Sequence, residues 1–274
     1  YEQLVDSFPY KETSDQEKAI NSTVSDMEKK LPMDRLICGG VGFGKTEVAL
    51  RAIIKAVSTN KTVVFLSPTT ILADQHFILA KERLGPIGVQ IELFSRFKSK
   101  SDQKRILQEI SCGALDLVIG THRLLSSDVF APSLGLLIVD EEHRFGVRHK
   151  EIIKNMRTNI DVLTLTATPI PRTLHQALVG IKDISNIFTP PLFRKPIKTR
   201  VNYFNWDIIT LSIKFELLRG GQVYFLHNNI SSLPFYFEKL SKLFPSHSIK
   251  CVHGKMKNKE LELSVLSFFR GEID

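Results

Sequence analysis

Short apolar runs alternate with amphipathic helical patterns between residues 34 and 190. The runs are rich in Leu, Ile and Val and are bounded by Gly, Pro or polar residues, which predicts buried strands. They cover residues 36–38, 62–66, 115–119, 136–139 and 162–165. Apolar residues recur at helical spacing over 46–57 and 103–110, which predicts helices there. Strands that alternate with helices indicate an α/β fold with a parallel sheet flanked by helices.

Prolines interrupt this alternation at 190–191 and again at Pro196. Paired prolines continue neither a helix nor a central strand, so they suit a linker. We therefore predict a first α/β domain over residues 1–190 and a second unit over 191–274. In the second unit the pattern predicts helices over 208–218 and 233–243, and strands over 223–226 and 249–252.

The composition of the 274 residues, 43% hydrophobic and 24% charged, is that of an ordinary globular protein and excludes a disordered or collagen-like chain. Cys38, Cys112 and Cys251 lie far apart and form no C-x-x-C pair. They indicate neither a disulfide framework nor a zinc site, and they fit a reducing, cytoplasmic location. No apolar run approaches the roughly 18 residues of a membrane helix, and the first residues show no signal-peptide pattern, so no membrane partner is expected.

The formal net charge of +8 is concentrated late in the chain, since residues 191–274 hold 13 Lys and Arg against 7 Asp and Glu. A positive balance is compatible with a polyanionic partner such as nucleic acid. On charge alone, a Lys-rich surface without such a partner is equally compatible.

A glycine-rich segment follows the first predicted strand and opens the first predicted helix. It comprises Gly39, Gly40, Val41, Gly42, Phe43, Gly44, Lys45 and Thr46. This is the G-x-x-x-x-G-K-[ST] pattern in the context that it requires. Its glycines let successive N–H groups face a phosphate, and the helix dipole adds to that field. The segment predicts an ATP site in which Lys45 reaches the β- and γ-phosphates and the Thr46 hydroxyl ligates Mg²⁺.

An acidic segment, Asp140, Glu141, Glu142 and His143, ends the strand predicted at 136–139. Ligands of open α/β sheets bind at the carboxyl ends of strands. Asp140 can hold Mg²⁺, and Glu141 can orient or deprotonate the water that attacks the γ-phosphate. An acidic run is by itself usually a solvated loop, but the preceding phosphate loop favours Lys45, Asp140 and Glu141 as catalytic residues. His143 is either a structural hydrogen-bonding group or a link from the nucleotide site to motion elsewhere, and we favour the link.

Small hydroxyl residues, Thr166 and Thr168, follow the strand predicted at 162–165. Their hydroxyls can bond the acidic segment and report whether the γ-phosphate is present. Taken alone, this segment is only a polar strand end.

Together and in this order, the three motifs resemble those of the superfamily 2 helicases and translocases. Within that superfamily the sequence is most similar to the bacterial transcription-repair coupling factors, and next to the RecG-type helicases. The similarity covers essentially the whole chain and is carried by residues 8–10, 13–16, 33–39, 68–73, 95–97, 119–125, 140–150 and 166–174. Residues 95–97 and 140–143 favour the coupling factors over RecG.

The resemblance implies two RecA-like lobes that close on ATP and step along double-stranded DNA. It implies a role in transcription-coupled repair, with RNA polymerase and excision repair proteins as partners through regions absent from this chain. Gln16 matches a glutamine that reads the adenine edge, with Phe8 or Tyr10 as a candidate stacking partner. The positions that match contacts to the DNA backbone are Thr69, Arg96, Thr121, His122 and His253. For Arg96 and its neighbours Lys98 and Lys100, and for the late lysines 255, 257 and 259, a merely solvated surface is the alternative.

The family's second lobe continues with a Q-x-x-G-R segment that carries an arginine finger, and this segment is not within residues 1–274. The resemblance therefore implies that residues 191–274 are the amino-terminal part of a truncated second lobe. An arginine finger is worth about 10³–10⁵ in rate, so the isolated chain is expected to bind ATP but hydrolyse it slowly. Two alternatives stay open: a RecG-like helicase, and a nucleotide-responsive DNA- or protein-binding module with little catalysis.

Overall fold

The computed structural model describes residues 11–96, 98–168, 183–191 and 197–274, except the side chains of 258 and 259. The chain divides into two compact units, Tyr1–Lys195 and Pro196–Asp274. Within the described ranges, no helix is both long enough and apolar enough to span a membrane.

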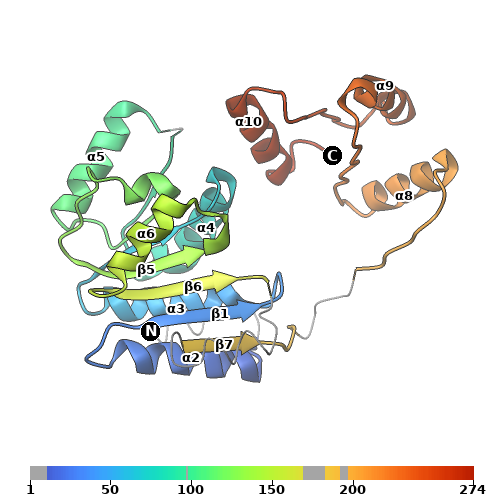
Figure 1. Ribbon diagram of the computed structural model, residues 1–274. Helices are drawn as coiled ribbons and strands as arrows, with labels where there is room; N and C mark the ends of the chain where they lie inside the picture. The colour runs from blue at the N-terminus through green and yellow to red at the C-terminus, as the bar shows by residue number, and fades with distance from the viewer. Residues whose placement is uncertain (1–10, 97, 169–182, 192–196) are drawn as a thin grey trace. The chain divides into compact units, whose positions relative to one another are not determined.

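The first unit is built on a seven-stranded sheet (Figure 1). Its strands are β1 (Asp34–Gly39), β2 (Thr62–Leu66), β3 (Ile91–Phe94), β4 (Leu117–Gly120), β5 (Leu134–Asp140), β6 (Asp161–Thr166) and β7 (Asp183–Ile187). Their order across the sheet is β3-β4-β2-β5-β6-β1-β7, and every pair is parallel. The five strands predicted for the first unit are confirmed: β2 has the predicted ends, and the ends of the other four differ by one or two residues. The sheet and its helices have the predicted RecA-like α/β fold.

Helices cover both faces of this sheet (Figure 1). Helices α2 (Ser14–Met27), α3 (Lys45–Val57) and α4 (Thr70–Leu84) contribute to one apolar core, and α5 (Lys100–Ser111) and α6 (Val147–Met156) to the other. The two predicted helices correspond to α3 and α5. Short 3-10 turns are η1 (Gly85–Ile87), η2 (His122–Leu125) and η3 (Glu142–Arg144).

Alternate residues of the central strands face opposite cores. In β2, Val63 and Phe65 belong to the core under α3, while Val64 and Leu66 belong to the core under α5 and α6. Burial on both sides explains why these strands are continuous apolar runs in the sequence. The order β5-β6-β1 also places the carboxyl ends of three strands side by side, and these ends carry the three sequence motifs.

Two strands of the sheet, β3 and β7, were not predicted from the sequence. They are the outermost strands of the sheet order. An outer strand is paired on one side only and tolerates polar residues, which are Glu92 in β3 and Asp183, Ser185 and Asn186 in β7. This polarity removed the apolar signal on which the sequence prediction relied.

The second unit contains α8 (Trp206–Leu218), η4 (Ile230–Ser232), α9 (Leu233–Leu243) and α10 (Asn258–Phe269). The helices predicted at 208–218 and 233–243 are confirmed. A small core forms around Ile213, Leu240 and Phe244.

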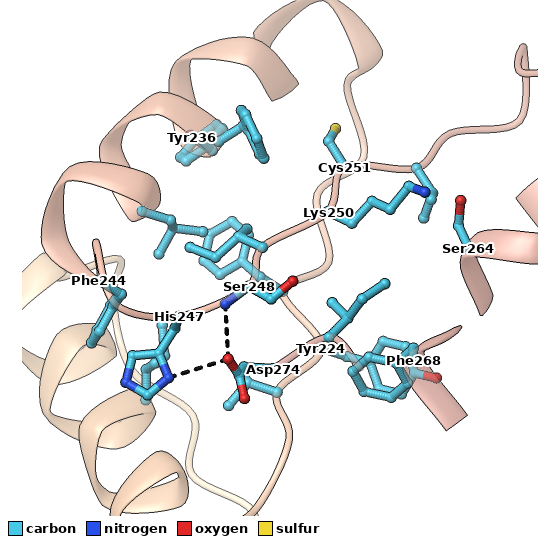
Figure 2. A pocket seen from close by; sticks show the side chains of 18 of the residues that line it. Tyr224, Tyr236, Phe244, His247, Ser248, Lys250, Cys251, Ser264, Phe268 and Asp274 are labelled. Carbon is cyan, nitrogen blue, oxygen red and sulfur yellow. Dashed lines mark hydrogen bonds and ion pairs between the residues drawn. The ribbon is translucent and has the colours of Figure 1, made fainter. Parts of the chain in front are cut away.

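The strands predicted at 223–226 and 249–252 are wrong, since neither segment forms a ladder in the described structure. Asp274 lies between them: Val223 N–H donates to its carbonyl (2.8 Å), and its own N–H donates to the Ser248 carbonyl (2.9 Å). A β-ladder needs repeated backbone hydrogen bonds between neighbouring strands. Asp274 makes only one such bond on each side. The two segments instead line an apolar pocket, shown in Figure 2, where the Asp274 carboxylate also accepts from Ser248 N–H (2.8 Å).

Candidate functional site

The phosphate loop connects β1 to α3 and is shaped by glycines in the left-handed region. Gly42 has φ +76° and Gly44 has φ +83°. The Lys45 ammonium donates to the carbonyls of Gly39 (2.7 Å) and Gly40 (3.0 Å), so it lies across the loop. Gly44 is the N-cap of α3 and offers no side-chain acceptor to the first N–H groups of the helix. A cation beside a helix N-terminus of this kind fits a phosphate group.

Gln16 ties the start of α2 to this loop. It is buried (2% exposed), and its amide nitrogen donates to the Phe43 carbonyl at 2.8 Å. Its amide oxygen accepts from Thr13 N–H (2.9 Å), which completes a capping box at the start of α2. Both ends of the Gln16 amide are therefore used within the protein. Adenine recognition by Gln16 stays a prediction, and its candidate partners Phe8 and Tyr10 lie outside the described residues.

Replacing Gly44 by Ala is expected to distort the phosphate loop and weaken ATP binding. A Cβ at this position would lie 2.2 Å from the Gln16 amide nitrogen, and the left-handed backbone adds strain of about 1–2 kcal/mol. Gly113→Ala is the matched control, because Gly113 has φ +73° but no atom closer than 3.9 Å to the added Cβ. Titration with a fluorescent ATP analogue should show at least about tenfold weaker binding for Gly44→Ala alone. Equal affinities of the two variants would contradict this close packing.

The end of β5 places Asp140 in a nearly buried position, 9% exposed. Its Oδ2 lies 3.1 Å from Nε2 of His76, which comes from α4, and the His76 ring packs on Phe65 at 4.5 Å. Sequence reasoning missed His76. A signal was available, because His76 lies three residues after buried Ala73 and four before buried Ala80, on the apolar face of its helix.

Glu141 is held by the end of β6. Its backbone adopts the left-handed conformation (φ 50°, ψ 54°), which is costly for a residue with a Cβ. Its Oε1 accepts from Ala167 N–H (2.8 Å) and its Oε2 from the Thr166 hydroxyl (3.3 Å), while His143 Nδ1 lies 3.2 Å from Oε2. The hydrogen bond that the sequence predicted between a hydroxyl of residues 166–168 and the acidic segment is thus present. Thr168 adds a hydroxyl contact to Thr166 at 2.8 Å.

Glu142 is turned away from these partners. Both of its carboxylate oxygens accept from Arg157 (2.9 and 2.8 Å), and Arg157 also donates to Asp34 at 3.0 Å. Arg157 is the C-cap of α6, so Glu142 joins the acidic segment to the end of that helix.

Four of the predicted DNA contacts follow neighbouring strands β2, β3 and β4. Thr69 caps α4 and accepts from Leu72 N–H (3.2 Å), and buried Thr121 precedes η2. The His122 ring lies 4.9 Å from that of His149, a residue of α6 that sequence reasoning also missed.

Burial chiefly lowers the pKa of His122, and the electrostatic effect of Arg96 adds to it. The lowered pKa favours the neutral form of the His122 imidazole. His253 belongs to the second unit, where its Nδ1 is buried without a hydrogen-bond partner among the described residues.

The parallel sheet, with the glycine loop after β1 and the acidic residues after β5 at the same edge, defines an ATPase domain of the P-loop class. A model of the DEAD/DEAH box helicase family matches residues 13–177, and the chain belongs to that family. Membership makes it an ATP-binding domain of the superfamily 2 class.

The chain is 50% identical over 98% of its length to the transcription-repair-coupling factor of Bacillus subtilis, and 52% identical over 96% to that of Escherichia coli. It spans 23% of each of these relatives. A structure of RecG bound to a three-way DNA junction covers the whole chain with a TM-score of 0.81 and 32% identity, and the match takes 37% of that chain. The similarity to coupling factors indicated by the motifs is confirmed.

Proposed function

We propose that the chain is part of an ATP-driven double-stranded DNA translocase that acts in transcription-coupled DNA repair. The observation that carries this proposal is the placement of the phosphate loop, Asp140 and Glu141 at the same edge of the sheet, where β1 and β5 end on either side of β6. The extended identity to coupling factors supports the biological role.

In this proposal ATP is the substrate, and residues 39–46 bind its phosphates. Lys45, which now donates to loop carbonyls, would donate to the β- and γ-phosphates instead. Thr46 and Asp140 supply the hydroxyl and carboxylate oxygens that suit Mg²⁺, which when bound would neutralise phosphate charge. Glu141 would orient the attacking water and accept its proton.

The DNA contacts would lie along the edge formed by Thr69, Arg96, Thr121 and His122. Hydroxyls, an imidazole and an arginine of this kind bind phosphates without reading sequence, as a translocase needs. RNA polymerase and excision repair proteins would be contacted by other parts of the whole protein.

Duplex DNA is expected to raise ATP turnover at least about tenfold in the protein that carries this sequence. Replacing Arg96 and His122 by Ala together should raise the DNA concentration needed for half-maximal stimulation about tenfold and reduce its salt dependence. Arg105→Ala is the control, since Arg105 is paired with Glu92 and Glu109 on the surface. Turnover that ignores duplex DNA would contradict the proposed function.

A RecG-like helicase is the second candidate, and the structural match to RecG on a three-way junction favours it. The two candidates differ in their DNA substrate. Unwinding of a three-way junction without RNA polymerase would support the RecG-like function, whereas displacement of a stalled polymerase from linear duplex would support the coupling function.

A further inference from the structure

His76 lies where α4 meets the acidic end of β5. Its side chain is 14% exposed, and its ring is fixed against Phe65 at a centroid distance of 4.5 Å. The helix is anchored near its other end, because Arg83 donates to both oxygens of buried Glu47 (3.0 and 3.3 Å). The position of the imidazole is therefore set by packing rather than by a flexible loop.

The contact with Asp140 joins Nε2 of His76 to Oδ2 of the carboxylate at 3.1 Å, which is hydrogen-bond distance. In such a contact the imidazole N–H donates and the carboxylate oxygen accepts. This hydrogen bond involves Oδ2 of Asp140, and Oδ1 takes no part in it.

We propose that His76 is a positioning residue for the metal ligand Asp140. By donating Nε2–H to Oδ2, it holds the carboxylate in one orientation, so that Oδ1 is available to Mg²⁺ without a further loss of side-chain freedom. Groups that orient a metal ligand in this way are typically worth 10–100-fold in metal affinity. This inference rests on the proposed role of Asp140 in the nucleotide site.

The test is the Mg²⁺ concentration that gives half-maximal Mg²⁺-dependent binding of a fluorescent ATP analogue to the 274-residue chain. His76→Ala should raise this midpoint about 10–100-fold and leave binding in excess EDTA unchanged. His76→Gln places an amide N–H near the position of Nε2, so its midpoint should stay within about threefold of the parent. His227→Ala is the matched control, because His227 also hydrogen-bonds a side chain, Ser232 at 2.7 Å, in the second unit.

A second readout does not depend on nucleotide or metal. Nitrogen NMR of the His76 ring should show the Nε2–H tautomer in the metal-free chain, and Asp140→Asn should shift that signal. This NMR measurement does not use the His76→Ala variant, so it remains informative if that variant does not fold.

Two results would overturn the proposal: a midpoint for His76→Ala within twofold of the parent, or an equal defect in His76→Ala and His76→Gln. Asp140→Asn separates this failure from failure of the proposed site. If Asp140→Asn leaves the Mg²⁺ midpoint unchanged, both the metal role of Asp140 and the role of His76 are rejected. If it raises the midpoint and His76→Ala does not, only His76 is rejected.

Discussion

Replacing Glu141 by Gln in the longer protein that carries this sequence is expected to lower ATP turnover about 10²–10⁴-fold, the usual contribution of a positioned general base, while ATP affinity changes less than about threefold. Gln is nearly isosteric and can keep the existing contacts, with its oxygen accepting from Ala167 N–H and its amide facing Thr166. It lacks the negative charge and the basicity that accept a proton. The substitution therefore removes the general base and keeps the hydrogen bonds that hold the side chain in place.

Lys45→Ala is the contrasting variant, because it should lose ATP binding itself. The Lys45 ammonium contacts the loop where the phosphates would bind, so its loss removes a charge-assisted contact from the bound nucleotide. Steady-state turnover and equilibrium nucleotide binding, measured on both variants with and without duplex DNA, separate the two roles. Unchanged turnover in Glu141→Gln would remove Glu141 from catalysis.

The central part of this site could be predicted from sequence because each motif is local. A glycine loop after a strand, or carboxylates at a strand end, are set by a few consecutive residues. Parallel strands bring their carboxyl ends to one edge, so the predicted fold already implied that the phosphate loop and the acidic segment lie at the same edge of the sheet.

The supporting contacts could not be predicted because they join distant parts of the chain. His76 and Asp140 are 64 residues apart, and Arg157 and Asp34 are 123 apart. Such pairs depend on how helices pack on the sheet. The second unit shows the opposite error, since its apolar runs at 223–226 and 249–252 have strand character but no ladder partner among the described residues.

A buried network of charged side chains is centred on Glu47, in the helix that follows the phosphate loop. We expect its loss to lower the free energy of unfolding strongly. Glu47 follows Thr46 in α3 and is 4% exposed. It accepts from Arg51 Nε (2.8 Å) in its own helix and from Arg83 Nη1 (3.0 Å) in α4. Arg51 also donates to Glu12 at 2.6 Å. Glu47 thus joins the helix that carries the phosphate loop to the helix that carries His76.

Glu47→Ala is expected to destabilise the first unit by about 3–5 kcal/mol, because it leaves two largely buried guanidinium groups without their shared carboxylate. Unfolding of the first unit in urea, followed by circular dichroism, measures this change. Trp206 is the single tryptophan and lies in α8 of the second unit, so its fluorescence follows that unit separately. Glu109→Ala, which removes a surface pair with Arg105, should cost less than about 1 kcal/mol. Equal losses for Glu47→Ala and Glu109→Ala would show that the network contributes no more than a surface ion pair, and that the phosphate-loop helix is held by apolar packing alone.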